Sequence, residues 1–84
     1  MESLRGYVMR QWAYLRKPYN TNKKDMVYKI MIHEMKKCTM VYLYCAKEAI
    51  MCSYDNWYPD LESALEDWES EIDSEGWHVI EETL

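Results

Sequence analysis

The sequence predicts an α+β fold: an antiparallel sheet of four to five strands with one acidic amphipathic helix packed on one face, in the order β-β-β-β-α-β. Segments rich in Val, Ile and Tyr recur with short polar separations, which is typical of antiparallel strands. A single later segment repeats its apolar residues with the period of a helix. The 84 residues, 49% of them hydrophobic, are enough for a single small domain, 1–84, and argue against disorder.

The first segment, residues 7–16, fits two patterns. Alternation gives a strand with one side formed by Tyr7, Met9, Gln11, Ala13 and Leu15, whereas Leu4, Tyr7, Val8, Trp12 and Leu15 fit a helical stripe. We favour the strand because aromatic and β-branched residues are prominent. The alternative order, α-β-β-β-α-β, stays open. Residues 18–25 (PYNTNKKD) are rich in turn formers and predict a loop within the domain.

Three more strands are predicted over residues 26–35, 40–46 and 49–55. If Lys47 and Glu48 form a two-residue turn, Leu43 opposes Cys52 and Tyr44 opposes Met51. One apolar face then holds Val41, Leu43, Cys45, Ile50, Cys52 and Tyr54. The register of residues 26–35 is open, since a one-residue change in the turn that follows them, KKCT at 36–39, exchanges the two sides. We favour inward-facing Tyr28, Ile30 and Ile32 over Val27, Met31 and His33.

The helix is predicted over residues 60–75. Pro59 and Asp60 are typical of a helix start, and Gly76 is typical of a helix end. The apolar stripe consists of Leu61, Ala64, Leu65, Trp68 and Ile72, and we expect it to face the sheet. Residues 77–83 return to alternation and predict a last strand.

Charge is strongly segregated along the chain. The net charge is −5, but all ten Lys and Arg residues lie between Arg5 and Lys47. From Glu48 onward the chain has acidic residues and no Lys or Arg. The helix carries acids on both flanks of its apolar stripe. We therefore expect the Lys and Arg residues of the sheet to compensate these acids, either within the fold or between two subunits.

The sequence favours a non-catalytic interaction module that binds another protein, as a regulatory or inhibitor-like domain, or associates with itself as a homodimer. The segment YDNWYP, 54–59, has the composition of a recognition loop. The acidic helix beside it is a candidate docking face for a basic partner. The candidate binding residues are Tyr54, Asp55, Trp57, Tyr58, Glu62, Glu66, Glu69 and Asp73.

Nucleic-acid binding by the basic first half is the alternative. Basic residues there are interleaved with aromatic ones, as in surfaces that hold phosphates and stack bases. The candidate residues are Arg10, Trp12, Arg16, Lys17, Lys23 and Lys24. The acidic net charge and the lack of a recognised RNA-binding motif make this the weaker prediction.

We expect no enzymatic activity, cofactor or metal. The chain has only two glycines, Gly6 and Gly76, and no phosphate-binding loop or nucleophile motif. Cys38, Cys45 and Cys52 recur every seven residues, a spacing that is not typical of zinc ligands. We expect no membrane association, because the longest apolar run, residues 40–46, is far too short to cross a bilayer. An odd number of cysteines fits reduced thiols and therefore the cytoplasm. The chain ends directly after a predicted strand, so it can be part of a longer protein.

Overall fold

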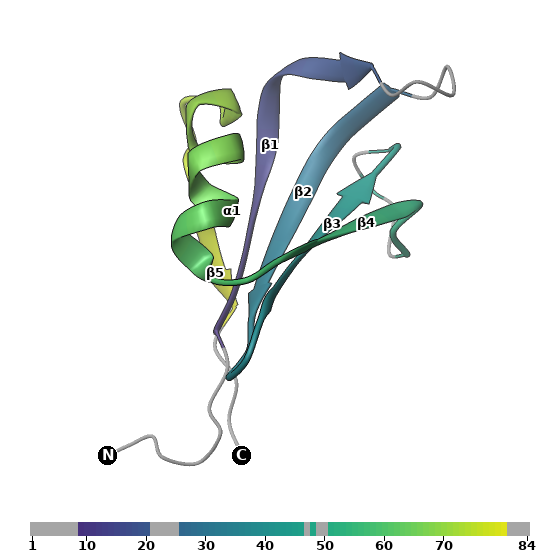
Figure 1. Ribbon diagram of the computed structural model, residues 1–84. Coiled ribbons are helices and arrows are strands. Elements are labelled where there is room, and N and C mark those ends of the chain that lie inside the picture. The colour runs from purple at the N-terminus through teal and green to yellow at the C-terminus, as the bar shows by residue number, and fades with distance from the viewer. Residues whose placement is uncertain (1–8, 21–25, 47, 49–50, 81–84) are drawn as a thin grey trace.

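A computed structural model describes residues 9–20, 26–46, 48 and 51–80. The strands in this part of the chain are β1 (Met9–Asn20), β2 (Met26–Glu34), β3 (Thr39–Tyr44), β4 (Tyr54–Tyr58) and β5 (His78–Ile80), with helix α1 (Leu61–Trp68) before β5. They form one antiparallel sheet in the spatial order β4-β3-β2-β1-β5. Helix α1 lies against the sheet (Figure 1). The predicted α+β class and the order β-β-β-β-α-β are confirmed.

Strand β1 is longer than predicted. The strand interpretation of residues 7–16 is confirmed from Met9 onward, while residues 7 and 8 lie outside the described ranges. The strand continues through Pro18, Tyr19 and Asn20, so the prediction of a loop there is wrong, and residues 21–25 are not described. The pairing with β2 shifts register between Tyr14 and Tyr19. Pro18 falls inside this interruption, where its missing N–H removes no regular ladder bond.

Strand β2 faces the core with Ile30 and Ile32, as predicted, but Tyr28 was wrongly expected to join them. Val27 is fully buried instead, and Tyr28 is only partly buried. The irregular pairing opposite Tyr14–Tyr19 changes the alternation at this end of the strand.

The connection after β3 is longer than the predicted two-residue turn. Leu43 pairs with Tyr54 rather than with Cys52, and the Ser53 amide donates to the Leu43 carbonyl at 2.8 Å. The predicted strand over residues 49–55 is therefore wrong, because the strand occupies Tyr54–Tyr58. Met51 and Cys52 are exposed instead of facing their predicted partners, and residues 47, 49 and 50 are not described. The pairing moves by two residues, so Tyr54 stays on the predicted inner face while Cys52 falls outside the strand.

Helix α1 starts as predicted and ends early. The Asp60 carboxylate accepts a hydrogen bond from the Ser63 amide at 2.8 Å, which caps the helix. The α-helix stops at Trp68, one 3-10 turn (η1, Glu69–Glu71) follows, and Ile72 is extended and bridges Leu15. The predicted helical end at residue 75 is wrong. Gly76, at φ +77°, donates to the Asp73 carbonyl in a turn and does not cap the helix.

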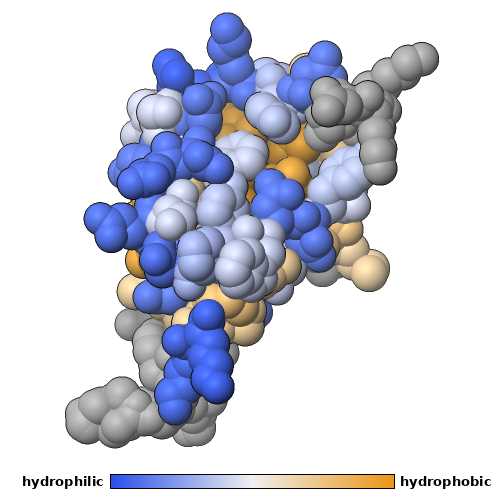
Figure 2. All heavy atoms as spheres, in the orientation of Figure 1, coloured by the Kyte–Doolittle hydropathy of each residue, from blue (hydrophilic) through white to orange (hydrophobic). Residues whose placement is uncertain are grey.

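The core lies between α1 and one face of the sheet. The predicted apolar stripe of the helix is confirmed, since all of its residues belong to the core or pack against it: Leu61, Ala64, Leu65, Trp68 and Ile72. An eight-residue helix spans about 12 Å, whereas the twelve residues of β1 extend over about 40 Å. The helix therefore covers only part of this face, and Figure 2 shows apolar surface beside its hydrophilic exterior.

Strand β5 closes the sheet beside β1, with His78 opposite Trp12. It covers residues 78–80 of the strand predicted over residues 77–83; residue 77 lies outside the strand, and residues 81–83 are not described. No helix in the described residues is long and apolar enough to cross a membrane.

Candidate functional site

The segment 54–59, whose composition suggested a recognition loop, contains the edge strand β4 (Tyr54–Tyr58), and the side chains of this strand divide between two faces. Tyr54 and Tyr58 pair with core-facing Leu43 and Thr39 and point toward the helix side. Asp55 and Trp57 pair with Tyr42 and Met40 and point to the other face, where 62% of Trp57 is exposed. The four aromatic and polar candidates of this segment do not form one surface.

A cleft of about 290 Å³ opens where β4, the end of α1 and the far end of β1 meet. It lies beside the end of the short helix, where the core face is left partly uncovered. Three aromatic residues, two carboxylates and one amide line it: Tyr19, Tyr58, Trp68, Asp67, Glu71 and Asn56. Of the predicted binding residues, only Tyr58 contributes to it.

A chain of hydrogen bonds fixes the wall of this cleft. The Trp68 indole Nε1–H donates to the Tyr58 hydroxyl at 3.0 Å, and that hydroxyl donates to Asp67 Oδ2 at 2.9 Å. The Tyr19 ring meets the Trp68 ring edge-on, with centroids 5.4 Å apart. Burial and the hydrogen bond to Asp67 raise the pKa of Tyr58 above its usual value. The hydroxyl therefore stays protonated at neutral pH and keeps its role as a donor.

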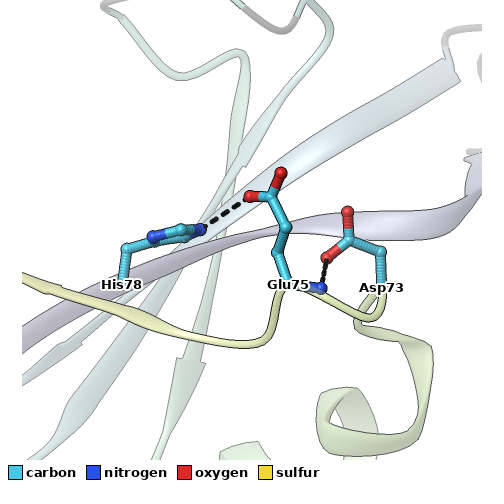
Figure 3. Close-up of polar contacts among 3 residues, drawn as sticks. All are labelled: Asp73, Glu75 and His78. Carbon is cyan, nitrogen blue, oxygen red and sulfur yellow. Dashed lines mark hydrogen bonds and ion pairs between the residues drawn. The ribbon is translucent and has the colours of Figure 1, made fainter.

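The acids that follow the helix contact neutral or weakly basic donors. Glu69 accepts from the Trp77 indole at 3.4 Å, and Asp73 accepts from the Glu75 amide at 3.0 Å. Glu75 Oε1 lies 2.9 Å from Nε2 of His78 (Figure 3). Within the described residues, none of the helix acids contacts Lys or Arg, so the expected compensation by the cations of the sheet is not seen there.

The predicted acidic candidates are spread along α1 and the turn after it. Glu62 and Glu66 are exposed on the helix and do not line the cleft. Glu69 and Asp73 bond to Trp77 and to the backbone beyond the helix end. The structure brings these four side chains to no common site.

The sheet face opposite α1 carries a row of rings and one cation. His78 stacks on Trp12 with ring centroids 4.2 Å apart, and the Lys29 ammonium lies 5.6 Å from the Trp12 centroid and 4.7 Å from that of Tyr44. These residues belong to four strands that are neighbours in the sheet. We call this row (His78, Trp12, Lys29, Tyr44) the aromatic ladder. Cation–π contacts of this kind stabilise the sheet surface.

Only part of the alternative nucleic-acid surface is brought together. Arg10 and Trp12 share the face of the aromatic ladder, and burial together with the charge of Arg10 lowers the pKa of His33 on the same face. Arg16 and Lys17 are exposed farther along β1. Lys23 and Lys24 lie outside the described residues.

The described residues contain no group of three His, Cys, Asp or Glu side chains suited to a metal ion. Cys38, Cys45 and Cys52 are free thiols, and Cys45 packs against the core as predicted. Cys52 was predicted on the inner face and is exposed. The absence of cofactors and metals remains a prediction.

Sequence reasoning missed most of the cleft, namely Tyr19, Asn56, Asp67, Trp68 and Glu71. Asn56 belongs to the segment chosen for its composition, and Asp67 and Glu71 are one helical turn apart. No local signal places Tyr19 beside them, because that contact depends on how far β1 extends. Comparisons with protein-family models, with curated proteins and with solved structures found no match for this chain. Function is therefore inferred from the geometry alone.

Proposed function

We propose that this protein is a non-catalytic interaction module that binds another protein through the surface where β4 meets the end of α1. The observation that carries the proposal is the cleft: the exposed Tyr19 ring and the partly buried Tyr58 ring line it beside exposed carboxylates that meet no Lys or Arg among the described residues. Aromatic side chains held in a fixed position are typical anchors of protein interfaces. Glu62 and Glu66 lie outside this surface.

The chemistry of the cleft supports binding rather than catalysis. Its walls offer rings, an amide and carboxylates, and the raised pKa of Tyr58 makes that hydroxyl a poor base or nucleophile at neutral pH. The free thiols support our expectation of a reducing compartment such as the cytoplasm.

Site-specific photo-crosslinking tests the proposal. A photoreactive phenylalanine analogue replaces Tyr19 in the cleft or, as a matched control, Lys37, which is exposed in the turn between β2 and β3. In extract from the source cells we expect a discrete crosslinked protein from position 19 that is absent from position 37. Identical products at both positions, or none at position 19, would contradict the proposal.

Self-association is a variant of the same proposal, in which the partner is a second copy of the chain. Complementary charge between a basic sheet edge and an acidic helix would orient such a dimer. Light scattering behind gel filtration over a hundredfold concentration range decides it, since a constant monomer mass removes the variant.

Nucleic-acid binding is the second candidate, favoured by one observation: Arg10, Trp12 and Lys29 share the face of the sheet opposite α1. Against it, His78 and Lys29 already contact the Trp12 ring, which leaves less of that ring free to stack a base. Titration of labelled single-stranded oligonucleotides at 50 mM salt tests this candidate. Binding that Arg10→Ala weakens and higher salt abolishes would support it.

A further inference from the structure

We infer that the cleft accepts one cationic side chain, Lys or Arg, from a basic segment of the partner protein. This inference rests on the proposed function and names the chemistry that the cleft recognises. Three properties of the described residues carry it: the aromatic walls, the uncompensated carboxylates and the size of the cleft.

The walls suit a cation because the rings of Tyr19, which is 47% exposed, and of partly buried Tyr58 line one space, while the largely buried Trp68 ring lies behind them. A Lys ammonium or Arg guanidinium is attracted to the face of such rings, and more strongly when water is excluded. The walls are also fixed before binding. The Trp68 indole is held by the Tyr58 hydroxyl and the Tyr19 ring packs edge-on against it. Little conformational freedom is therefore lost when a side chain enters.

The carboxylates supply the opposite charge. Among the described residues, Asp67 receives one hydrogen bond, from the neutral Tyr58 hydroxyl, and contacts no cation, so its charge and its other oxygen are not matched there. Glu71 makes no hydrogen bond or ion pair within the described residues. Both side chains line the same cleft as the three rings. The two carboxylates would repel an anionic ligand such as a phosphate. They would attract a cation, and so would the aromatic rings of the cleft.

The size fits a side chain better than a cofactor. Small-molecule sites commonly start at about 300 Å³ and enclose most of their ligand, and this cleft of about 290 Å³ remains open on one side. A long side chain that enters from an extended segment would fill it, while its backbone stays outside. The exposed acids of α1 and the turn after it would attract the remaining positive charge of such a segment.

The test uses seven-residue peptides of Gly and Ser with Lys, Arg, trimethyl-lysine or uncharged norleucine at the centre. Binding is followed by NMR on protein with ¹⁵N-labelled tryptophan, because the Trp68 Nε1–H that bonds to Tyr58 reports directly on the wall. We expect the charged peptides to shift this signal saturably and the norleucine peptide to leave it in place. The order of affinity among the charged peptides distinguishes Lys, Arg and methylated lysine.

Two matched double variants then separate the cleft from the general acidity of the helix. Asp67→Asn with Glu71→Gln removes two charges from the cleft, and the asparagine oxygen still accepts from Tyr58. Glu62→Gln with Glu66→Gln removes two charges from the same helix outside the cleft. We expect about tenfold weaker binding in the first variant and a change of less than about twofold in the second.

Equal weakening by both variants, or equal binding of the norleucine peptide, would overturn the inference. Unchanged chemical shifts of the tryptophan signals in the free variants establish that each is folded. If the crosslinked partner at position 19 is found but its binding is insensitive to Asp67→Asn with Glu71→Gln, the proposed function stands and the cationic side chain is wrong. If no partner is found there, the proposed function itself fails.

Discussion

At the scale of single residues, Tyr58 joins the strand layer to the helix layer. Its hydroxyl accepts from the Trp68 indole and donates to Asp67, so one atom ties β4 to the last turn of α1. The sequence indicated Tyr58 as a candidate because of its surroundings in YDNWYP. Its partners lie nine and ten residues later, on a helix whose rotation relative to the strand has no local signal.

Tyr58→Phe is expected to destabilise the fold by about 1–2 kcal/mol, because the largely buried Trp68 indole loses its acceptor. Urea denaturation measures this change. Tyr19→Phe is the control, since it keeps the ring contact with Trp68 and the Tyr19 hydroxyl makes no hydrogen bond among the described residues. Equal loss in both variants would show that the hydroxyl bond to Trp68 contributes nothing specific.

Thr39 offers a second prediction at this scale. Its side chain is 1% exposed, and Oγ1 finds no partner among the described residues. Thr39→Val replaces the hydroxyl with a methyl group of similar size, and we expect the free energy of unfolding to rise by about 1 kcal/mol. Thr39→Ser keeps the hydroxyl and loses the methyl, so it should lower stability. A drop in the valine variant would mean that the hydroxyl is satisfied in solution.

At the scale of the elements, the start of α1 has a local signal, whereas the end of α1 and the start of β4 do not. The start of α1 follows from Asp60, whose carboxylate acts on an amide three residues away. The end of α1 depends on Ile72. This residue fits the apolar stripe of a longer helix, but it reaches the core in an extended conformation, bridged to Leu15. The start of β4 likewise depends on its pairing with Leu43, and the sequence does not determine the length of the connection between the two strands. These two errors share one cause: a residue distant in the sequence decides where the element begins or ends.

The Asp60 cap gives a pH-dependent prediction. The hydrogen bond from the Ser63 backbone amide lowers the pKa of Asp60 below its usual value. A lowered pKa in the folded state means that the charged cap stabilises the fold above the unfolded pKa, near 4, and that this contribution is lost as the pH falls through the folded pKa. We therefore expect Asp60→Ala to lower the urea midpoint at pH 7, and by less at pH 2.5.

Asp60→Asn is the matched control for this experiment. Asparagine caps without a charge, so its difference from Asp60→Ala should be the same at both pH values. If the wild type and Asp60→Ala differ equally at pH 7 and pH 2.5, the charge of Asp60 does not contribute to the cap.

At the scale of the whole molecule, the charge segregation of the sequence becomes a segregation between layers. Lys29 and Arg10 lie on the sheet face away from α1, whereas the acids of residues 60–75 lie on the helix, its cap and the turn after it; Asp55 on β4 is an exception that shares the face of Lys29. The sequence predicted the layers but not this separation. The direction in which each Lys or Arg points depends on strand register, and composition alone does not determine it.

This separation predicts the response to salt. Because the helix acids meet no Lys or Arg among the described residues, repulsion between like charges such as Glu62 and Glu66 should dominate. We expect the free energy of unfolding to rise, by up to about 1 kcal/mol, from 10 mM to 500 mM sodium chloride. Glu62→Gln with Glu66→Gln should reduce that rise. A fall in stability with salt would instead favour the compensation by sheet cations that the sequence suggested.

The position of β1 between β2 and β5 has a consequence for the order of assembly. A chain terminated before Leu61 retains the segments of four strands, yet it lacks both the helix that covers Ile30, Ile32 and Val41 and the strand that pairs with the outer edge of β1. Such a product would expose an apolar sheet face and an unpaired edge strand. Both features promote aggregation of incompletely folded chains. Folding of this sheet therefore depends on the last segments of the chain to be made, α1 and β5.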